Sequence, residues 1–172
     1  MTTIPESVLA PGRWQLATTL SSASFAVRNF GFRTVTGTIP IRDAHVEVDG
    51  AGDPVAIRAL LDLAGIDTAN ERRDIDLQKP RLLDTANFPT LSFSAALPRR
   101  LDDEWEISGR LEGRQATDVE LTARIVRHDA DGQVTVHAEA VVDRQALGVR
   151  APRPMIGRQV RVTIQAAFTP PR

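Results

Sequence analysis

"EWEISGRLEGRQATDVELTARI", residues 104–125, sets the fold class, because its hydropathy alternates residue by residue on both sides of one short interruption. Trp105, Ile107 and Leu111 fall in one phase, and charged residues fill most of the other phase. Successive side chains of a β-strand point to opposite faces, so this period predicts two strands with one apolar face each. The interruption is short, which predicts that the two strands are antiparallel neighbours.

The same alternation recurs along the rest of the chain. Expected strands lie at residues 14–20, 24–29, 35–48, 55–63, 91–97, 134–142 and 160–168. Stretches rich in Gly, Pro and Asp separate many of them and are typical of turns. About eight strands with one apolar face each must hide one continuous apolar surface, which a closed barrel or a sandwich does.

One of these segments, at 35–48, changes phase along its length. Ile39 and Ile41 share one register, whereas Val46 and Val48 share the other. One extra residue near positions 42–43, a β-bulge, explains the slip. Closing a sheet into a barrel needs strong local bending, so the bulge favours a barrel over a sandwich.

A single segment, residues 70–79, has helical character. Asn70 is a good N-cap, and Glu71 lies in the first turn. We expect Ile75 and Leu77 to face inward. The side chains expected to face water are Arg72, Arg73, Asp76 and Lys79. A short helix between two strands of a barrel is expected to lie across one mouth.

Composition limits the remaining classes of protein. The chain has 172 residues, which suggests a single domain over residues 1–172. It has no cysteine, and its three histidines are not at zinc-like spacing, so we expect no metal site and no cofactor. Basic and acidic residues balance at a net charge of −1, which argues against a nucleic-acid partner.

The start of the chain and its hydropathy bear on location. Residues 1–14 have neither the basic region nor the apolar stretch of a signal peptide. No window approaches the roughly 20 apolar residues of a membrane helix. We therefore expect a cytoplasmic protein without an integral membrane segment, and a homodimer remains open.

The sequence also lacks the common signatures of catalysis. No G-x-S-x-G, H-E-x-x-H, Walker or dinucleotide-binding pattern is present, so no catalytic residue is assigned. Asp67, Asp74 and Asp76 are close in sequence, but solvated surface charge explains them better than an acid–base cluster.

Small residues on the apolar phases decide whether a barrel would be hollow. They are Ala59, Ala95, Gly109, Ala123, Ala138, Ala140 and Ala166. An eight-stranded barrel is just wide enough for its own side chains to fill, so small residues leave room for a ligand. Large neighbours such as Trp105 and Phe168 could instead fill that room, and the residues alone leave both outcomes open.

Several of these segments together resemble the signature of the YceI-like family. "NFPTLSF" at 87–93 resembles the aromatic-proline motif of the family, and "SFAVRNFGFRTVTGTI" at 24–39 resembles its second strand and the following turn. "VVDRQALGV" at 141–149 is similar to its D-R-x-x-x-G-V element. The family pattern T-x-N-x-x-R-D-x-H-L is matched at Thr68, Asn70, Arg73, Asp74 and Leu77.

The resemblance implies an all-β fold, namely a single antiparallel eight-stranded lipocalin-like β-barrel with a short helix near one mouth. It covers a core of about residues 14–168, and it implies binding of polyisoprenoids in a cavity. Three polar positions depart from the family: Asp76 and Asn29 replace histidines, and Leu20 or Ser21 stands where a third is usual. These departures leave the identity of a ligand head group open.

The expected site residues form two sets. The apolar residues expected to bind a ligand are Phe25, Val27, Phe30, Phe32, Ile39, Leu61, Leu63, Leu77, Phe88, Phe93, Trp105, Leu111, Leu121, Ile125, Val136, Ala138, Leu147 and Phe168. The polar residues expected at the rim are Asn29, Arg72, Arg73, Asp74, Asp76 and Arg144. Within these sets, Arg73 and Asp74 are expected to tie the helix to the rim by a charge-assisted hydrogen bond. Arg144 is expected to pair with Asp143 or to reach the rim.

Two functions that use a cavity are compatible with these features, and a third hypothesis is a filled barrel that acts only through its surface. The first is the binding or carriage of a long apolar ligand, a polyprenyl chain or an isoprenoid quinone, with a lipid or small apolar molecule as the ligand partner. The alternative is a cofactor-independent enzyme of the cyclase or isomerase type that uses the barrel cavity. The first is preferred, because burial of hydrocarbon explains the apolar faces without any catalytic group.

Overall fold

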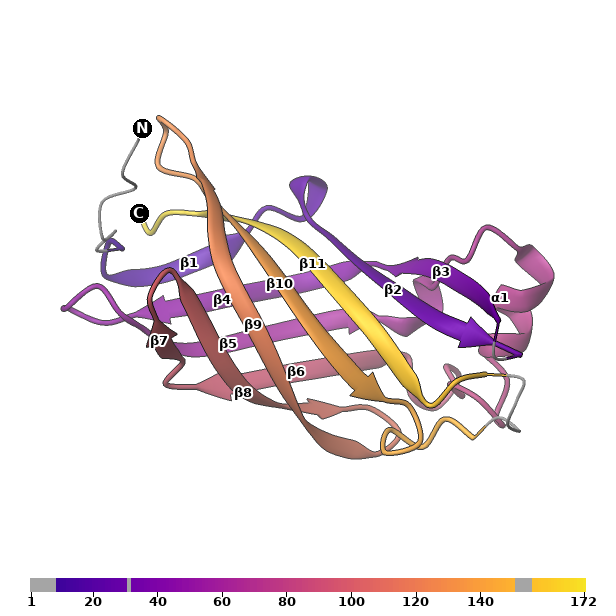
Figure 1. Cartoon of the computed structure of the whole chain (residues 1–172). Coiled ribbons are helices and arrows are strands. Elements are labelled where there is room, and N and C mark those ends of the chain that lie inside the picture. Colours follow the sequence, from indigo (N-terminus) through magenta and orange to yellow (C-terminus); the bar gives the residue numbers. More distant parts are fainter. Residues whose placement is uncertain (1–8, 31, 151–155) are drawn as a thin grey trace.

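The period-two segments form one antiparallel sheet that closes on itself (Figure 1). The structure is a computed structural model, and it describes residues 9–30, 32–150 and 156–172. The strands are β1 (Gly12–Leu16), β2 (Ser22–Asn29), β3 (Arg33–Ile39), β4 (Ile41–Val48), β5 (Pro54–Asp62), β6 (Thr90–Ala96), β7 (Arg99–Leu101), β8 (Glu104–Glu112), β9 (Ala116–His128), β10 (Val134–Asp143) and β11 (Gln159–Thr169). The helical elements are α1 (Glu71–Leu77) and two 3-10 turns at Thr18–Leu20 and Leu63–Gly65.

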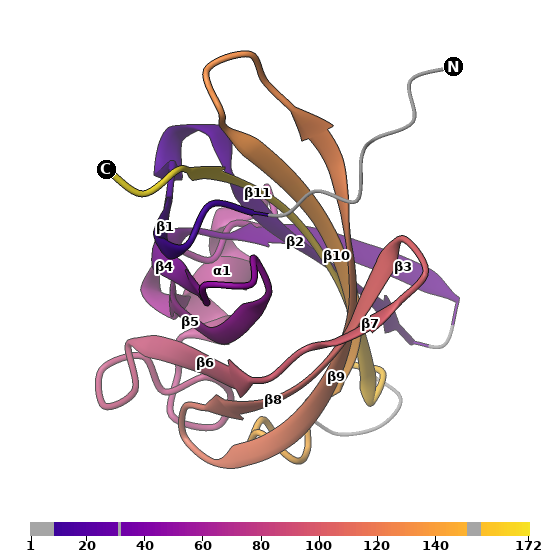
Figure 2. The same cartoon turned by 90° about the vertical axis from the view of Figure 1, so that its left-hand side faces the viewer.

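The last strand closes the barrel. Along one edge β11 pairs with β10, and along the other it pairs with β1 and β2. Leu16 lies opposite Phe168 in the β1–β11 pairing, and Phe25 lies opposite Val162 in the β2–β11 pairing. Every pairing of neighbouring strands is antiparallel, and Figure 2 shows from one end how the strands encircle a central axis.

Three positions in the wall are each occupied by two short strands in succession: β1 with β2, β3 with β4, and β6 with β7. Pro40 separates β3 from β4, and Pro98 separates β6 from β7. Proline lacks an N–H donor, so each interrupts the ladder of hydrogen bonds. Counted by wall positions, this is a closed eight-stranded barrel, which confirms the predicted fold.

The predicted β-bulge is present in β4. The pairing of β4 with β5 shifts register between Ile41 and Asp43, so Arg42 is the extra residue. The strand expected over residues 14–20 is shorter than predicted: β1 ends at Leu16, and Leu20 lies in the 3-10 turn with 59% of its surface exposed. Alternation of apolar and polar residues with a period of two cannot show whether the last residues of a segment continue the strand or form a single helical turn.

The helix lies at the end of the barrel where β5 ends and β6 begins (Figure 1). The Asn70 side chain accepts a hydrogen bond of 3.0 Å from the backbone N–H of Arg73, as expected of an N-cap. The chain before the helix is joined to the wall, because Asp67 and Thr38 exchange two backbone hydrogen bonds of 2.8 and 2.9 Å. The helix is thereby fixed to the edge of β3 at one mouth.

Candidate functional site: an apolar cavity inside the barrel

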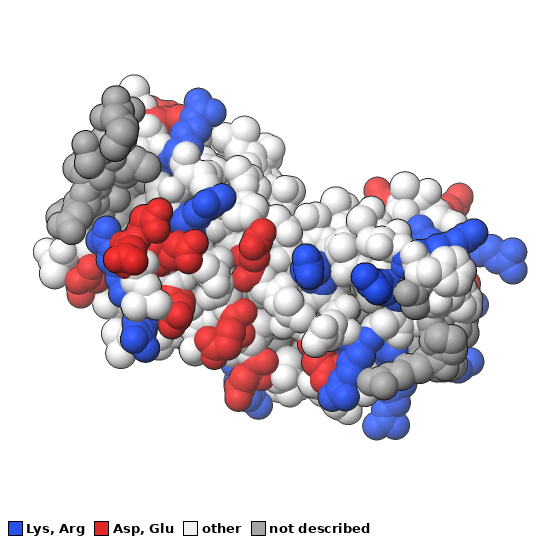
Figure 3. Space-filling model, viewed as in Figure 1, with Lys and Arg blue, Asp and Glu red and all other residues white. Residues whose placement is uncertain are grey.

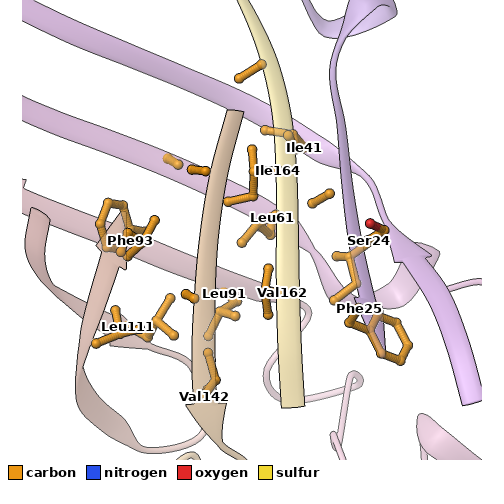
Figure 4. Close-up of a pocket in the computed structure, with 18 of the residues that line it drawn as sticks. Ser24, Phe25, Ile41, Leu61, Leu91, Phe93, Leu111, Val142, Val162 and Ile164 are labelled. Carbon is orange, nitrogen blue, oxygen red and sulfur yellow. The ribbon is translucent and has the colours of Figure 1, made fainter. Parts of the chain in front are cut away.

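The barrel encloses a cavity of about 530 Å³. Its lining is formed by the inward faces of the strands, with contributions from α1 and from the loops at the same end of the barrel. In Figure 4 side chains such as Phe25, Leu61, Leu91, Phe93 and Val162 converge from different strands on this space. The volume lies within the range of roughly 300–1,000 Å³ that is usual for sites of small molecules.

The packing of the described residues explains why this space stays open. A filled domain usually has one contiguous core, whereas here the buried residues form two clusters. One cluster surrounds Trp14 and Phe168, and the other surrounds Phe93 and Leu111. No large side chain in the described part of the chain falls below 2% exposure, because the inward-facing side chains border the cavity. The predicted hollow barrel is therefore the observed one.

Small residues supply part of the room, as the sequence suggested. The small residues that line the cavity include Ala59, Ala123, Ala138, Ala140 and Ala166. Two others act differently. Ala95 and Gly109 do not line it, and the ring of Phe93 covers Gly109. A Cβ on Gly109 would lie 2.3 Å from that ring, so the glycine is what allows the aromatic side chain to lie flat on the wall.

Among the described residues, polar side chains reach the cavity at five positions: Ser24, Thr68, Arg73, Asp76 and Arg144. The Ser24 hydroxyl donates to the carbonyl of Thr163 at 3.3 Å on the neighbouring strand. The other four belong to α1 and to the loops at the α1 end of the barrel. The polar groups of the cavity are thus concentrated at one end of an otherwise apolar space.

Thr68 is the centre of the hydrogen bonds that hold α1. Its side chain is 5% exposed. Its backbone N–H donates to the Asp74 carboxylate at 3.0 Å, and its hydroxyl donates to the same carboxylate. Arg73 donates from Nε to the Thr68 hydroxyl at 2.9 Å and from Nη2 to the Thr68 carbonyl at 3.0 Å. Arg73 and Asp74 therefore fasten the helix through one shared threonine.

Arg144 holds the loop that follows β10. The side chain is 4% exposed, and it donates to the carbonyls of Gly157, Val149 and Ile156 at 2.8, 2.8 and 2.6 Å. Asp143, the partner considered from sequence, accepts instead from Arg158 at 2.8 Å. The planar guanidinium presents several donors in fixed directions, which suits the organisation of a loop around one side chain.

Two carboxylates at this end have lowered pKa values. A hydrogen bond from Lys79, with its charge, lowers the pKa of Asp76 below the ordinary 3.8, and the two side chains are 2.7 Å apart. A hydrogen bond from Arg158 lowers the pKa of Asp143 in the same way. Both carboxylates are therefore ionised near neutral pH.

The structure places most of the apolar residues singled out in the sequence on the cavity wall. All of them line the cavity except Phe32 and Phe88. Phe32 is 79% exposed at the turn between β2 and β3, whereas Phe88 is half-buried in the segment before β6. Phe30 both lines the cavity and is 48% exposed, so it stands at the opening. Alternation cannot place residues in turns, which is why these positions were not separated in advance.

Some of the polar residues singled out in the sequence line the cavity and others do not. Arg73, Asp76 and Arg144 line the cavity, whereas Arg72 and Asp74 do not. The side chain of Asn29 lies outside the described part of the structure.

The orientation expected for the helix was right for Leu77 and wrong for Ile75. Ile75 is 57% exposed, and Leu77 faces the cavity together with Arg73 and Asp76. Successive residues of an α-helix are about 100° apart, so two positions separated by two residues cannot share a face. Arg73, four positions before Leu77, lies on the same side as Leu77, and Asp76 borders the cavity while its side chain is 50% exposed and paired with Lys79.

Several cavity residues were not identified from the sequence. Leu82, Leu83, Val149 and Ile156 lie outside the strands and line the α1 end of the cavity. Loops have no periodic pattern. The available signal was the presence of apolar residues in these loops, because a solvated loop does not need them. Within the described chain, no group of three or more potential metal ligands is found. None of the described helices has the length and hydropathy required to span a membrane.

Comparisons with known proteins agree with this architecture. The family model of the YceI-like domain matches residues 14–168. BcnA of Burkholderia cenocepacia is similar in structure, with a TM-score of 0.78 and 14% identity over 88% of this chain and 98% of that one. A polyisoprenoid-binding domain from Saccharophagus degradans, implicated in plant cell wall breakdown, gives a TM-score of 0.69 and 15% identity over 92% of this chain and 98% of that one.

A third solved structure is similar in the same way. The YceI protein of Campylobacter jejuni gives a TM-score of 0.67 and 17% identity over 79% of this chain and 85% of that one. At such identities the likeness establishes the fold. No curated protein sequence matches the chain.

Proposed function

This chain belongs to the YceI-like family, and from that premise we propose that it holds a long apolar ligand of the isoprenoid type inside its barrel. The observation that carries the proposal is the cavity of about 530 Å³, whose described lining is apolar apart from Ser24 and the polar groups at the α1 end. A polar ligand would lose its hydrogen bonds to water on entering such a space, at a cost of several kcal/mol. A hydrocarbon chain loses nothing comparable.

Burial of hydrocarbon supplies the binding free energy. Each CH₂ removed from water contributes roughly 0.8 kcal/mol, so a five-carbon isoprene unit contributes about 3–4 kcal/mol before ordering costs. A few units suffice for tight binding without directional contacts. Such a site selects length and shape, and it tolerates changes at the polar end of the ligand.

The polar groups at the α1 end give the ligand an orientation. Arg73 and Asp76 lie where the cavity meets the helix, and Phe30 stands partly in solvent at the same end. We place the polar terminus of the ligand here and its hydrocarbon tail towards the cluster around Trp14 and Phe168. The Saccharophagus relative, whose name records polyisoprenoid binding, supports this ligand class.

The enzymatic alternative has weaker support. Arg73 and Thr68 are committed to hydrogen bonds that hold the helix, and Arg144 is committed to the loop carbonyls. Asp76 is ionised and paired with Lys79, and its lowered pKa makes it a weak base at neutral pH. The arrangement therefore favours retention of a ligand over its chemical conversion.

Mass spectrometry of an organic extract from the natively purified protein tests the proposal. We expect a co-purifying lipid with repeating five-carbon units, in an amount that approaches one molecule per chain. Protein stripped of lipid should then bind an added polyprenol and unfold at a higher temperature in its presence. An empty extract, together with no thermal shift from polyprenols or isoprenoid quinones, would remove the basis for the proposal.

A further inference from the structure

The two ends of the barrel differ in charge. Figure 3 shows Lys and Arg gathered at the end that carries α1 and the turn between β2 and β3, whereas Asp and Glu predominate at the opposite end. The chain as a whole carries a net charge of only −1, so the difference is one of distribution. A surface with one cationic end approaches an anionic surface in a defined orientation.

The cations at the α1 end are largely free to bind a partner. The exposed arginines there that form no ion pair within the described residues include Arg28, Arg33, Arg72, Arg81 and Arg150, whereas Arg114 donates to the carbonyls of Pro80 and Leu82. Most carboxylates at this end are already engaged within the protein. Asp74 binds Thr68, Asp76 binds Lys79, and Asp143 binds Arg158.

Exposed apolar side chains accompany these arginines. Phe32 is 79% exposed and Phe30 is 48% exposed, on either side of the turn between β2 and β3. Ile75 is 57% exposed on α1. Single exposed apolar residues are common, but two of the six phenylalanines lie at one turn beside the opening of an apolar cavity.

Other exposed apolar residues lie at the opposite end in a different electrostatic setting. Leu97 is 75% exposed and Leu101 is 40% exposed. The exposed carboxylates of Asp102, Asp103 and Glu104 follow directly. Arg99 and Arg100 lie between the two leucines, so these apolar residues have a mixed-charge surrounding in which carboxylates accompany the arginines, and they provide an internal control.

We propose that the α1 end docks on an anionic lipid bilayer. Phe32, Phe30 and Ile75 enter the interface between head groups and acyl chains, and the exposed arginines bind the lipid phosphates. Aromatic side chains suit this interface, because an apolar ring can be buried at small depth. The docked orientation turns the opening beside Phe30 towards the bilayer, so that, given the proposed ligand, hydrocarbon passes between membrane and cavity without crossing water.

Flotation of the full chain with lipid vesicles tests this surface. We expect binding to vesicles of phosphatidylcholine with phosphatidylglycerol, weak binding to phosphatidylcholine alone, and loss of binding as salt screens the charges. Phe32→Ser with Ile75→Ser should weaken binding roughly tenfold or more, since two apolar side chains no longer leave water. Neither residue lines the cavity, so the content of the cavity should not change.

Charge reversal tests the contribution of the exposed arginines to vesicle binding. Arg33→Glu with Arg72→Glu should weaken binding to the anionic vesicles by at least roughly tenfold. The matched controls lie at the opposite end: Leu97→Ser with Leu101→Ser for the apolar pair, and Arg99→Glu with Arg172→Glu for the charges. Both controls should bind like the unmodified protein.

Three outcomes would overturn the proposal. They are absence of vesicle binding, equal effects of the variants and of their controls, and loss of binding on charge reversal with no effect of the apolar pair. The last result would indicate a site for a soluble polyanion. Lipid in the organic extract without vesicle binding refutes docking alone, and vesicle binding with an empty extract refutes the proposed ligand alone.

Discussion

The ring of Phe93 on β6 occupies the space that a Cβ on Gly109 of β8 would need. The Cβ would lie 2.3 Å from a ring atom and 2.9 Å from the backbone carbonyl of Ser94. A side chain of any size at position 109 therefore moves an aromatic residue of the cavity wall. Phe25 and Gly37 repeat the arrangement on β2 and β3, where the corresponding distance is 2.6 Å. Two aromatic residues of the lining depend in this way on glycines in neighbouring strands.

Gly109→Ala should destabilise the protein by about 1–3 kcal/mol, because the new methyl group overlaps both the ring and the backbone. The free energy of unfolding in urea measures the effect. Gly50→Ala is the matched control, since nothing lies within 4 Å of a Cβ at that position. If both variants were equally stable, the close approach of Phe93 to Gly109 would not be a feature of the folded protein.

Thr68→Val should lower the free energy of unfolding by about 1–3 kcal/mol. The variant lacks the buried hydroxyl that donates to Asp74 and accepts from Arg73. Thr68→Ser keeps the hydroxyl and should recover most of the loss. Urea denaturation of the two variants compares them directly. Equal destabilisation by valine and serine would assign the role of this position to its methyl group rather than to its hydrogen bonds.

Ala138→Phe should reduce the amount of apolar ligand bound, because the added ring enters the cavity from β10. The remaining volume shortens the chain that fits, so affinity for long polyprenols should fall more than affinity for short ones. Ligand titration by tryptophan fluorescence or calorimetry measures this. Val141→Phe on the outer face of the same strand, where Val141 is 54% exposed, should leave binding unchanged. Identical titrations of the two variants would contradict binding inside the barrel.

The Asp143–Arg158 pair predicts a small dependence of stability on pH. The pKa of Asp143 is lower in the folded protein than its ordinary value of 3.8, so the pair stabilises the fold above that pH. The contribution is lost as the pH falls through the folded pKa. Asp143→Asn should therefore lower the unfolding temperature slightly at neutral pH, and the difference should vanish well below pH 3.8.

Asp103→Asn is the control for this titration, because Asp103 is exposed and has no ion pair among the described residues. Its unfolding temperature should follow that of the unmodified protein across the pH range. A difference between Asp143→Asn and the unmodified protein that persists in strong acid would show that Asp143 acts through something other than its charge.

The wall of the barrel could be predicted from the sequence, because strands that bury one face show it in every second residue. Even the extra residue at Arg42 was visible as a change of phase between Ile41 and Val46. The break at Pro40 was not anticipated, and β7 lies between the strands expected at 91–97 and from 104 onward, where no strand was predicted; each pair of short strands continues one position of the wall. Alternation describes the faces of a strand and contains little information about where its ladder is interrupted.

The mouth of the cavity was harder to predict than the wall. The seven residues of α1 have too few positions for a periodic pattern, and Ile75 was placed on the wrong face. Arg144 was singled out by its motif, but the carbonyls of Gly157, Val149 and Ile156 that accept from it come from a loop without regular structure. Contacts of this kind depend on how the chain returns between strands, which no local pattern encodes.

The closure of the wall by β11 has a consequence for the biogenesis of the protein. Gln15 pairs with Thr169, so the first and last strands of the barrel must meet across almost the whole length of the chain. Contacts so distant in sequence are entropically costly to form and make folding slow. On the ribosome the lumen cannot exist until the final strand has emerged, and the nascent sheet exposes its apolar face until then. Any cargo must therefore be taken up after β11 has emerged and paired with β1.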